Sequence, residues 1–108
     1  MQLDITHQAD RSRYEVDADG VSAGFLAYRQ VEDARCLTHI EVDDAFSGRG
    51  LATKLVEFAL SDARTHQIQV LPACPFVRGY LLKHREHMGL VPAAARPRYG
   101  LAAEPTAG

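Results

Sequence analysis

The fold of this chain is decided by one stretch of sequence, which reads His39-Ile40-Glu41-Val42, then Phe46-Ser47-Gly48-Arg49-Gly50-Leu51-Ala52, then Leu71-Pro72-Ala73-Cys74-Pro75-Phe76-Val77. The order of these segments predicts a strand, a glycine-containing turn, an amphipathic helix, a short strand and the start of a second helix. Each junction exposes a group that is useful for chemistry. The stretch therefore bears on function as well as on fold.

The glycine-containing turn is a candidate phosphate site. Gly48 and Gly50 lie between the predicted strand and the predicted helix. A turn that opens directly into a helix aims free backbone N–H groups and the positive end of the helix dipole at one point. That arrangement suits a phosphate group.

The residues before this stretch predict further strands. Segments 12–18 and 21–30 read as two strands joined by the turn Asp19-Gly20, which is a short-range hairpin signal. Residues 3–7 add an edge strand, and residues 35–42 form the strand that leads into the glycine turn. Side chains alternate along a strand, so we expect one face of this last strand to carry Thr38, Ile40 and Val42 and the other to carry Leu37, His39 and Glu41.

The residues after the turn predict a helix, a strand and a second helix. From Gly50, apolar residues recur at helical spacing as far as Ala63, so this helix should lie on the sheet. Residues 67–71 form a short strand ended by Pro72, and Phe76, Val77, Tyr80 and Leu81 stand at helical spacing after Cys74. The strands on either side of the first helix should pair in parallel through a right-handed crossover. The predicted fold is therefore α/β (α+β), with a mixed, mostly antiparallel sheet that has one parallel pair and two flanking helices.

Composition limits the functional classes. The chain has 108 residues, 46% of them hydrophobic, which is enough for one domain with a single core. A net charge of -2 gives no electrostatic case for binding nucleic acid. No apolar run is long enough to span a membrane, and the N-terminus lacks the pattern of a signal peptide, so we expect a cytoplasmic protein. We place the domain at residues 1–91 and read residues 92–108 as a flexible tail.

Cys74 is the most consequential candidate for catalysis. Proline is preferred in the first helical turn, so Pro75 places Cys74 at or next to the N-cap, where unpaired backbone donors favour a reactive thiolate. The alternative to a catalytic role is a structural one, in which Cys74 is a small apolar side chain buried in the core. Cys36, the other cysteine, is assigned to packing, and both thiols should be reduced. The histidines and cysteines show no metal-ligand spacing, so we expect no metal site.

His39 and Glu41 are candidates for a general base. Both should point the same way from one strand, close enough to serve a shared site. Histidine titrates near neutral pH by itself, and glutamate does so when it is desolvated. A His and a Glu on a solvated sheet face are also ordinary, so a structural role stays open for either of them.

The motifs together resemble the minimal branch of the GNAT acyltransferase superfamily, of roughly one hundred residues. The residues that carry the resemblance are His39-Ile40-Glu41-Val42, Gly48-Arg49-Gly50-Leu51-Ala52, Cys74-Pro75-Phe76-Val77 and His84-Arg85-Glu86-His87. The resemblance covers most of residues 14–91. It implies an N-acetyltransferase that binds acetyl-CoA where two parallel strands splay apart, with the pyrophosphate on the loop at Gly48 to Ala52. Ser47 departs from the Arg or Gln of the superfamily pattern.

The resemblance also implies the remaining site residues. The cofactor, acetyl-CoA or CoA, would be bound by Ile40, Val42, Ser47, Gly48, Arg49, Gly50, Leu51, Ala52, Phe76 and Tyr80. The catalytic candidates would be Cys74, as an acyl acceptor or activating thiol, with His39 and Glu41. For Tyr80 the alternative to cofactor binding is core packing. For Arg49 it is an exposed position on the turn without a role in binding. The amine or protein acceptor and the oligomeric state are left open. The rival functions are a non-catalytic CoA-binding or protein-interaction module and a redox sensor that uses Cys74.

Overall fold

The chain folds as a mixed sheet with two α-helices and several 3-10 turns. The computed structural model describes residues 1–101. In chain order the strands and α-helices are β1 (Leu3–Gln8), β2 (Arg13–Ala18), β3 (Val21–Val31), β4 (Ala34–Val42), α1 (Leu51–Thr65), β5 (Gln69–Pro72) and α2 (Pro75–Lys83). The 3-10 turns are η1 (Ala9–Arg11), η2 (Asp44–Phe46), η3 (Arg85–Leu90) and η4 (Ala93–Tyr99).

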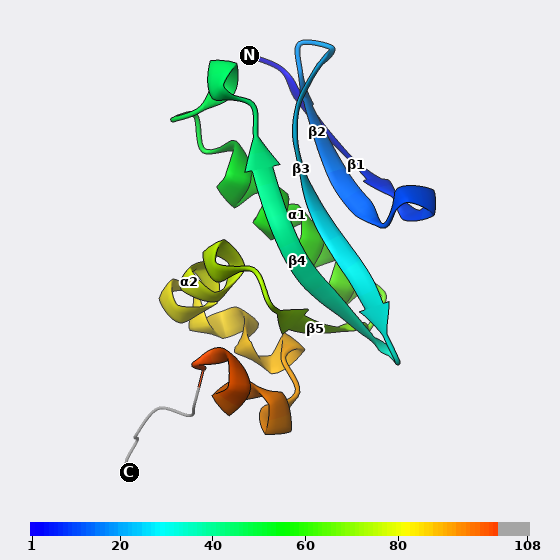
Figure 1. Cartoon of the computed structure of the whole chain (residues 1–108), viewed down its shortest axis with the longest axis vertical. Coiled ribbons are helices and arrows are strands. Elements are labelled where there is room, and N and C mark those ends of the chain that lie inside the picture. The colour runs from blue at the N-terminus through cyan, green and yellow to red at the C-terminus, as the bar shows by residue number, and fades with distance from the viewer. Residues whose placement is uncertain (102–108) are drawn as a thin grey trace.

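The sheet has the order β1-β2-β3-β4-β5, and adjacent strands are antiparallel from β1 to β4 (Figure 1). β4 and β5 pair in parallel, with α1 as the connection between them. The predicted fold class is confirmed. The predicted strand before Pro72 begins two residues later than expected, because Gln67 adopts a positive φ of 56° that breaks an extended backbone.

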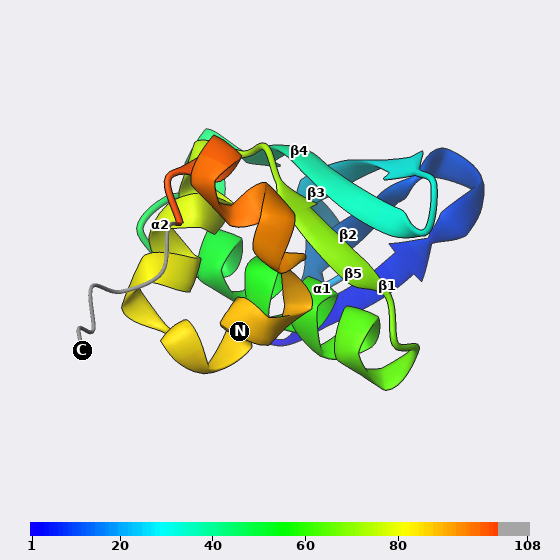
Figure 2. The same cartoon turned by 90° about the horizontal axis from the view of Figure 1, so that it is seen from below.

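The core lies between the sheet and α1, which covers one face of the strands (Figure 2). β2 contributes every second residue to it, as a half-buried strand should. The apolar stripe of α1 lies against the same face and is buried at Leu51, Leu55, Val56, Ala59, Leu60 and Ala63. The opposite face of β2–β4 is not covered by a helix within residues 1–101.

A bulge in β4 changes which residues share a face. His39 lies opposite Ala27 and Leu37 lies opposite Tyr28, so Thr38 is an extra residue in β4. Its hydroxyl donates to the Ala27 carbonyl at 3.2 Å. The bulge places Leu37 in the core, whereas His39 is exposed. The prediction that Leu37 shares a face with His39 and Glu41 is therefore wrong, because one inserted residue reverses the alternation.

A buried polar cluster joins the sheet to α1. The Arg35 guanidinium donates to the Tyr14 hydroxyl at 2.6 Å and to the Asp62 carboxylate at 3.1 Å, and Tyr14 in turn donates to Asp62 at 2.8 Å. Arg35 also lies over the Tyr28 ring, 4.6 Å from its centroid. These contacts connect β4 to the last turns of α1, so they help to hold the strand and the helix at fixed positions.

The segment after residue 91 packs on the domain. η4 occupies most of residues 92–99, and Ala95 and Leu101 are buried in the core cluster. The prediction of a flexible tail is therefore wrong for residues 92–101, because apolar side chains of this segment pack in the core. The rest of the predicted tail, residues 102–108, lies outside the described residues.

Candidate functional site

The parallel strands separate at the end of β5. Their pairing runs from Ala34–Gln69 to Leu37–Pro72, and β4 then continues to Val42 paired with β3 but not with β5. The last link across the gap is the Cys74 backbone N–H, which donates to the Leu37 carbonyl at 2.8 Å. Beyond it, no strand of residues 1–101 lies along this edge of β4. A free strand edge can accept an extended ligand that carries amide groups.

The glycine turn lies at the open end of this gap. Gly48 and Gly50 have positive φ angles of 79° and 75°, a region that strongly favours glycine. Gly50 is the N-cap of α1, and no side chain among the described residues caps the helix. Ser47 could cap a helix start with its hydroxyl, but this hydroxyl instead donates to the Asp44 carbonyl at 3.1 Å. The first N–H groups of α1 are thus left without a side-chain partner.

A hollow of about 270 Å³ extends from this turn. It brings together most of the residues that the resemblance implies for the cofactor, and its walls also include two residues that sequence reasoning missed, Phe46 and Thr53. The predicted residues that line it are Val42, Ser47, Gly48, Gly50, Leu51, Ala52 and Phe76. Ile40 is half-buried against the core, and Arg49 is exposed on the turn, so neither lines this hollow.

A second hollow, of about 310 Å³, continues along α2. It shares Thr53 and Phe76 with the first, so the two form one groove, which we call the α1–α2 groove. Tyr80 lies in the second hollow, and its hydroxyl donates to the Glu57 carboxylate of α1 at 3.3 Å. Burial, followed by the Glu57 charge, raises the pKa of Tyr80, which keeps the hydroxyl neutral as a donor.

Sequence reasoning missed three residues of the second hollow besides Thr53. Gly79, Lys83 and His84 line it together with Tyr80. Lys83 and His84 stand three and four positions after Tyr80, so helical spacing was the signal that could have placed them on its face. Their position in a mixed-charge cluster at the end of α2 obscured that signal.

Cys74 is at the N-cap of α2, with Pro75 in the first turn, as predicted. Its side chain is buried, with only 3% of the residue exposed, and it belongs to the core cluster. Cys36 is also buried, and neither cysteine is in a disulfide. Within residues 1–101 no hydrogen bond or ion pair joins Cys74 to His39 or Glu41. The structure thus does not bring the three catalytic candidates together.

His39 and Glu41 form a pair on the uncovered face of the sheet. Their side chains point the same way, as predicted, and His39 Nε2 lies 2.9 Å from Glu41 Oε2. The carboxylate only accepts, so Nε2 carries the proton in this contact and Nδ1 is left to accept one. The rings of His39 and Phe25 pack edge to face, with 6.1 Å between their centroids.

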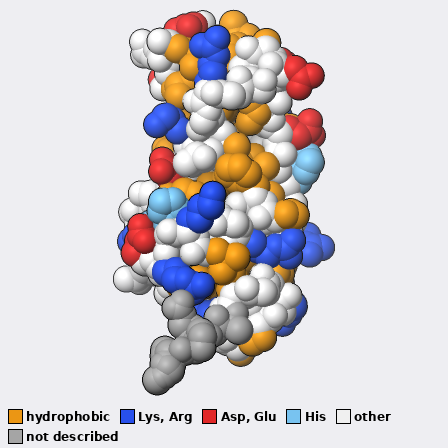
Figure 3. Space-filling view, turned by 90° about the vertical axis from the view of Figure 1, so that its left-hand side faces the viewer, with side chains coloured by type: hydrophobic (Ala, Val, Ile, Leu, Met, Phe, Trp, Pro, Cys, Tyr) orange, Lys and Arg blue, Asp and Glu red, His pale blue; other side chains and the backbone are white. Residues whose placement is uncertain are grey.

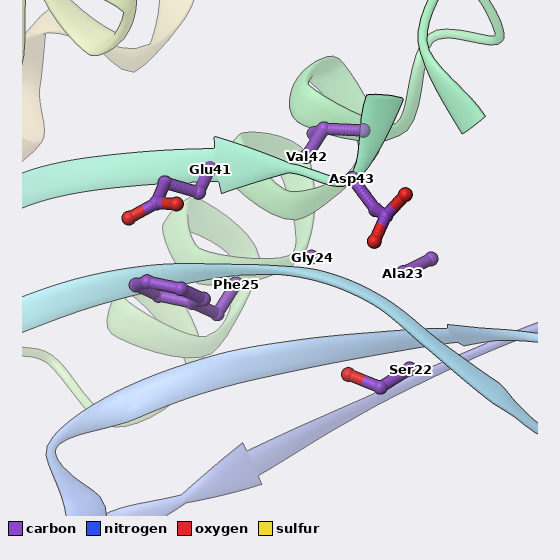
Figure 4. A pocket seen from close by; sticks show the side chains of 7 residues that line it. All are labelled: Ser22, Ala23, Gly24, Phe25, Glu41, Val42 and Asp43. Carbon is purple, nitrogen blue, oxygen red and sulfur yellow. The ribbon is translucent and has the colours of Figure 1, made fainter. Parts of the chain in front are cut away.

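A hollow of about 200 Å³ lies beside Glu41. Figure 4 shows Phe25 and Glu41 at one end of it and Asp43 and Ser22 at the other. Gly24 forms its floor, where β3 and β4 approach so closely that an added Cβ would lie 2.5 Å from the Glu41 carbonyl oxygen. The uncovered sheet face is therefore hollowed next to the His39–Glu41 pair.

Residues 1–101 contain neither a cluster of metal-binding side chains nor a membrane-spanning helix. No three His, Cys, Asp or Glu side chains gather in a way that would hold a metal ion. No helix in that range combines the length and apolar character needed to cross a membrane.

Comparison with protein families gives one match, which covers residues 13–90 and is described as a GCN5-related N-acetyltransferase. The chain belongs to this family. The predicted GNAT family and the predicted enzyme class, an acyltransferase, are thereby confirmed. In GNAT terms, the separated strands β4 and β5 and the glycine turn before α1 are where the resemblance predicts acetyl-CoA. No curated protein matched the chain.

Solved structures of other GNAT proteins share the fold. A GCN5-like candidate N-acetyltransferase from Staphylococcus aureus, solved by NMR, is 20% identical, with a TM-score of 0.64, and the match covers 82% of this chain and 87% of that one. A ribosomal-protein-alanine N-acetyltransferase from Brucella melitensis biovar Abortus 2308 is also 20% identical, with a TM-score of 0.52, over 94% of this chain and 71% of that one. At this identity the likeness concerns the fold alone.

Proposed function

We propose that this GNAT protein transfers the acetyl group of acetyl-CoA to an amine, directly and without an acyl-enzyme. The observation that carries the proposal is the separation of β4 from β5 beyond Leu37, with the glycine turn and the α1–α2 groove at the same end. Acetyl-CoA supplies an activated thioester. The unpaired edge of β4 suits the amide groups of its pantetheine arm, and the free N–H groups of α1 suit its pyrophosphate.

The His39–Glu41 pair is proposed as the base. The acceptor nitrogen forms a bond to the thioester carbon while Nδ1 of His39 takes its proton, and the C–S bond breaks to release the CoA thiolate. Glu41 holds the ring through Nε2 and stabilises the imidazolium that forms. The hollow beside Glu41 offers the acceptor an approach from the uncovered face of the sheet.

Burial of Cys74 supports direct transfer over a cysteine-mediated route. Cys74 is only 3% exposed, so its thiol must become accessible before it can attack a thioester. The His39–Glu41 pair is already exposed. Cys74 then has a packing role at the start of α2, where its backbone links the helix to β4. The proposal specifies the acceptor only by its chemical class, an amine.

Titration calorimetry followed by CoA-release kinetics tests the proposal. The protein should bind acetyl-CoA and release CoA when amines such as a lysine-containing peptide are added. His39→Gln should lower kcat/KM by about 10²-fold or more, the usual contribution of a general base. The matched control is His66→Gln, a histidine at the C-terminal end of α1.

The alternatives give different results in the same experiment. Binding of acetyl-CoA without CoA release across the amine panel would favour a non-catalytic module. Full activity of His39→Gln and of Glu41→Gln, each with an unchanged pH–rate profile, would remove the pair from the mechanism. A protein that ignores CoA and responds to peroxide at Cys74 would support the redox-sensor alternative.

A further inference from the structure

β1 is an edge strand of the sheet, and no strand of residues 1–101 lies along its outer edge (Figure 1). An unpaired strand edge is a template for another strand, so folded proteins usually protect it with lysine, proline, a bulge or a covering segment. β1 contains no lysine and no proline, and it pairs with β2 along its whole length without a register shift. Its outer edge is therefore open to a further strand.

The other edge strand of the sheet, β5, is protected. It is only four residues long and ends at Pro72. η4 lies beside it (Figure 2), and Pro92 and Ala95 line a hollow together with Gln69 and Leu71 of β5. The surface on the α2 side of the molecule carries Lys, Arg, Asp and Glu side chains among the hydrophobic ones (Figure 3). The sheet can therefore be extended at β1 rather than at β5.

The outer edge of β1 presents the backbone groups of Leu3, Ile5 and His7. The Gln2 carbonyl accepts from the Asp19 N–H at 2.8 Å, and the Gln2 N–H donates to the Asp19 carboxylate at 2.9 Å, so the backbone groups of Gln2 point toward β2. Successive residues of a strand point their N–H and C=O groups to opposite sides. The backbone groups of residues 3, 5 and 7 therefore point away from β2 and can bind another strand.

β1 also leaves apolar surface uncovered on the face against which α1 packs. Leu3 and Ile5 are half-buried, whereas the inward-facing residues of β2 beside them are at most 1% exposed. Phe58 of α1, whose ring packs edge-on against Tyr14 of β2, is 37% exposed. A strand added beside β1 would remove part of this apolar surface from water.

The backbone of β1 is complementary to that of a second β1 strand in one antiparallel register. When Ile5 of one copy lies opposite Ile5 of the other, Leu3 of each copy lies opposite His7 of the other. The outward N–H and C=O groups of residues 3, 5 and 7 then all face outward groups of the other copy, as the pairs of an antiparallel ladder require. The arrangement has two-fold symmetry, which is the commonest symmetry of protein dimers.

Charge favours the same register. Asp4 and Thr6 are exposed, and Asp4 of one copy lies opposite Thr6 of the other. The Thr6 hydroxyl accepts from Gln8 Nε2 at 2.9 Å, so its proton is left to donate to that carboxylate. A shift that pairs Leu3 with Ile5 would instead place two Asp4 carboxylates opposite each other, which is unfavourable. Antiparallel pairing also turns the end of one copy that carries Asp4 toward the end of the other that carries Arg11, whose side chain is 61% exposed.

We propose that two copies of this chain form a dimer through antiparallel β1 strands centred on Ile5, so that their sheets join into one. The inference goes beyond the proposed function and does not depend on it. Opposite residues of a sheet share a face, so both α1 helices cover one face of the joined sheet. Both His39–Glu41 pairs then lie on the other face.

Analytical ultracentrifugation of the full chain tests the dimer. The mass of the wild-type protein should rise with concentration from one chain to two, with a Kd of roughly 1–100 µM, because a short strand buries less surface than a standard interface. Thr6→Asp places like charges opposite each other twice, once on each side of the two-fold axis, and should raise this Kd by about tenfold. Thr65→Asp makes the same change at an exposed position in the last turn of α1 and should leave the Kd unchanged.

A charge reversal distinguishes repulsion from misfolding. In Asp4→Lys/Thr6→Asp, opposite charges face each other across the two strands, so the Kd should return to the wild-type value or below it. A Thr6→Asp variant that fails to dimerise because it is misfolded would not be restored by a second substitution on the surface. The melting temperature of each variant gives an independent check of folding.

Three outcomes would overturn the proposal. The first is wild-type protein that stays monomeric up to about 500 µM, well above the expected Kd. The second is a dimer that Thr6→Asp does not weaken, because the two copies would then use another surface. The third is a folded Thr6→Asp variant that Asp4→Lys does not restore, which would exclude the register centred on Ile5. None of these results bears on acetyl-CoA binding, so the proposed function is tested separately.

Discussion

Replacement of Asp62 by alanine tests the buried cluster that joins β4 to α1. The Asp62 side chain is 16% exposed and accepts from both Arg35 and Tyr14, and the Arg35 side chain is 11% exposed. The variant leaves the Arg35 charge buried with the Tyr14 hydroxyl as its remaining hydrogen-bond partner in the cluster. Breaking a buried pair in this way costs 3–5 kcal/mol in general, and because the pair is slightly exposed we expect about 3 kcal/mol.

The expected loss is large enough to measure and small enough to leave a folded protein. A loss of about 3 kcal/mol compares with a total stability of roughly 5–15 kcal/mol for a domain. It corresponds to a fall of about 12 °C in melting temperature for a chain of this size. Urea denaturation followed by circular dichroism gives the free energy of unfolding. Asp33→Ala, an exposed aspartate at the turn between β3 and β4, should change it by less than about 0.5 kcal/mol.

A double-mutant cycle shows whether the loss comes from the pair. When Arg35→Met is combined with Asp62→Ala, the second change should cost much less than it does alone, because no unpaired charge remains. Costs that simply add in the double variant would refute the reasoning. So would an Asp62→Ala variant as stable as the Asp33→Ala control.

Three further predictions concern the site and its support. Gly50→Ala forces a positive φ of 75° on a residue with a Cβ, so CoA affinity measured by calorimetry should fall by about tenfold or more, and unchanged affinity would contradict the phosphate assignment. Cys74→Ser should keep CoA-release activity to within a few fold while lowering the melting temperature, and complete loss of activity in a folded variant would instead indicate an acyl-enzyme. Burial, and then the nearby Arg35 charge, hold the pKa of His7 below 6.5 in the folded state. The unfolded chain therefore binds more protons than the folded chain as the pH falls below 6.5, and stability is lost as the pH falls through the folded pKa. The free energy of unfolding should therefore decrease less in His7→Asn than in the wild type between about pH 7.5 and about pH 5, and equal decreases would contradict this assignment.

The sequence predicted the order of strands and helices because each carries its own periodicity and turn signals. Gly50 and Pro75 marked the starts of both α-helices by local chemistry. The fate of residues 92–101 was missed, since Leu101 is buried only by surfaces that distant segments create. An alanine- and proline-rich segment shows no pattern of its own that would reveal such a surface.

The candidate site was predictable where function depends on local sequence. The glycine turn and the same-side placement of His39 and Glu41 followed from spacing alone. The contact of Arg35 with Asp62 joins residues 27 positions apart, which periodicity cannot relate. Lys83 belonged to a cluster of mixed charge, so its position on the groove emerged only from the packing of α2 beside α1.

The bulge at Thr38 divides β4 into two halves in which odd-numbered side chains point to opposite faces of the sheet. Before it, the odd-numbered positions Arg35 and Leu37 are buried, and after it the odd-numbered positions His39 and Glu41 are exposed. Loss of Thr38 alone would leave Leu37 opposite Tyr28 and His39 opposite Ala27, so both side chains would keep their faces and the strand would lose only its extra residue. In a regular strand that kept Thr38, Leu37 and His39 would share one face, so the exposure of the proposed base depends on the bulge.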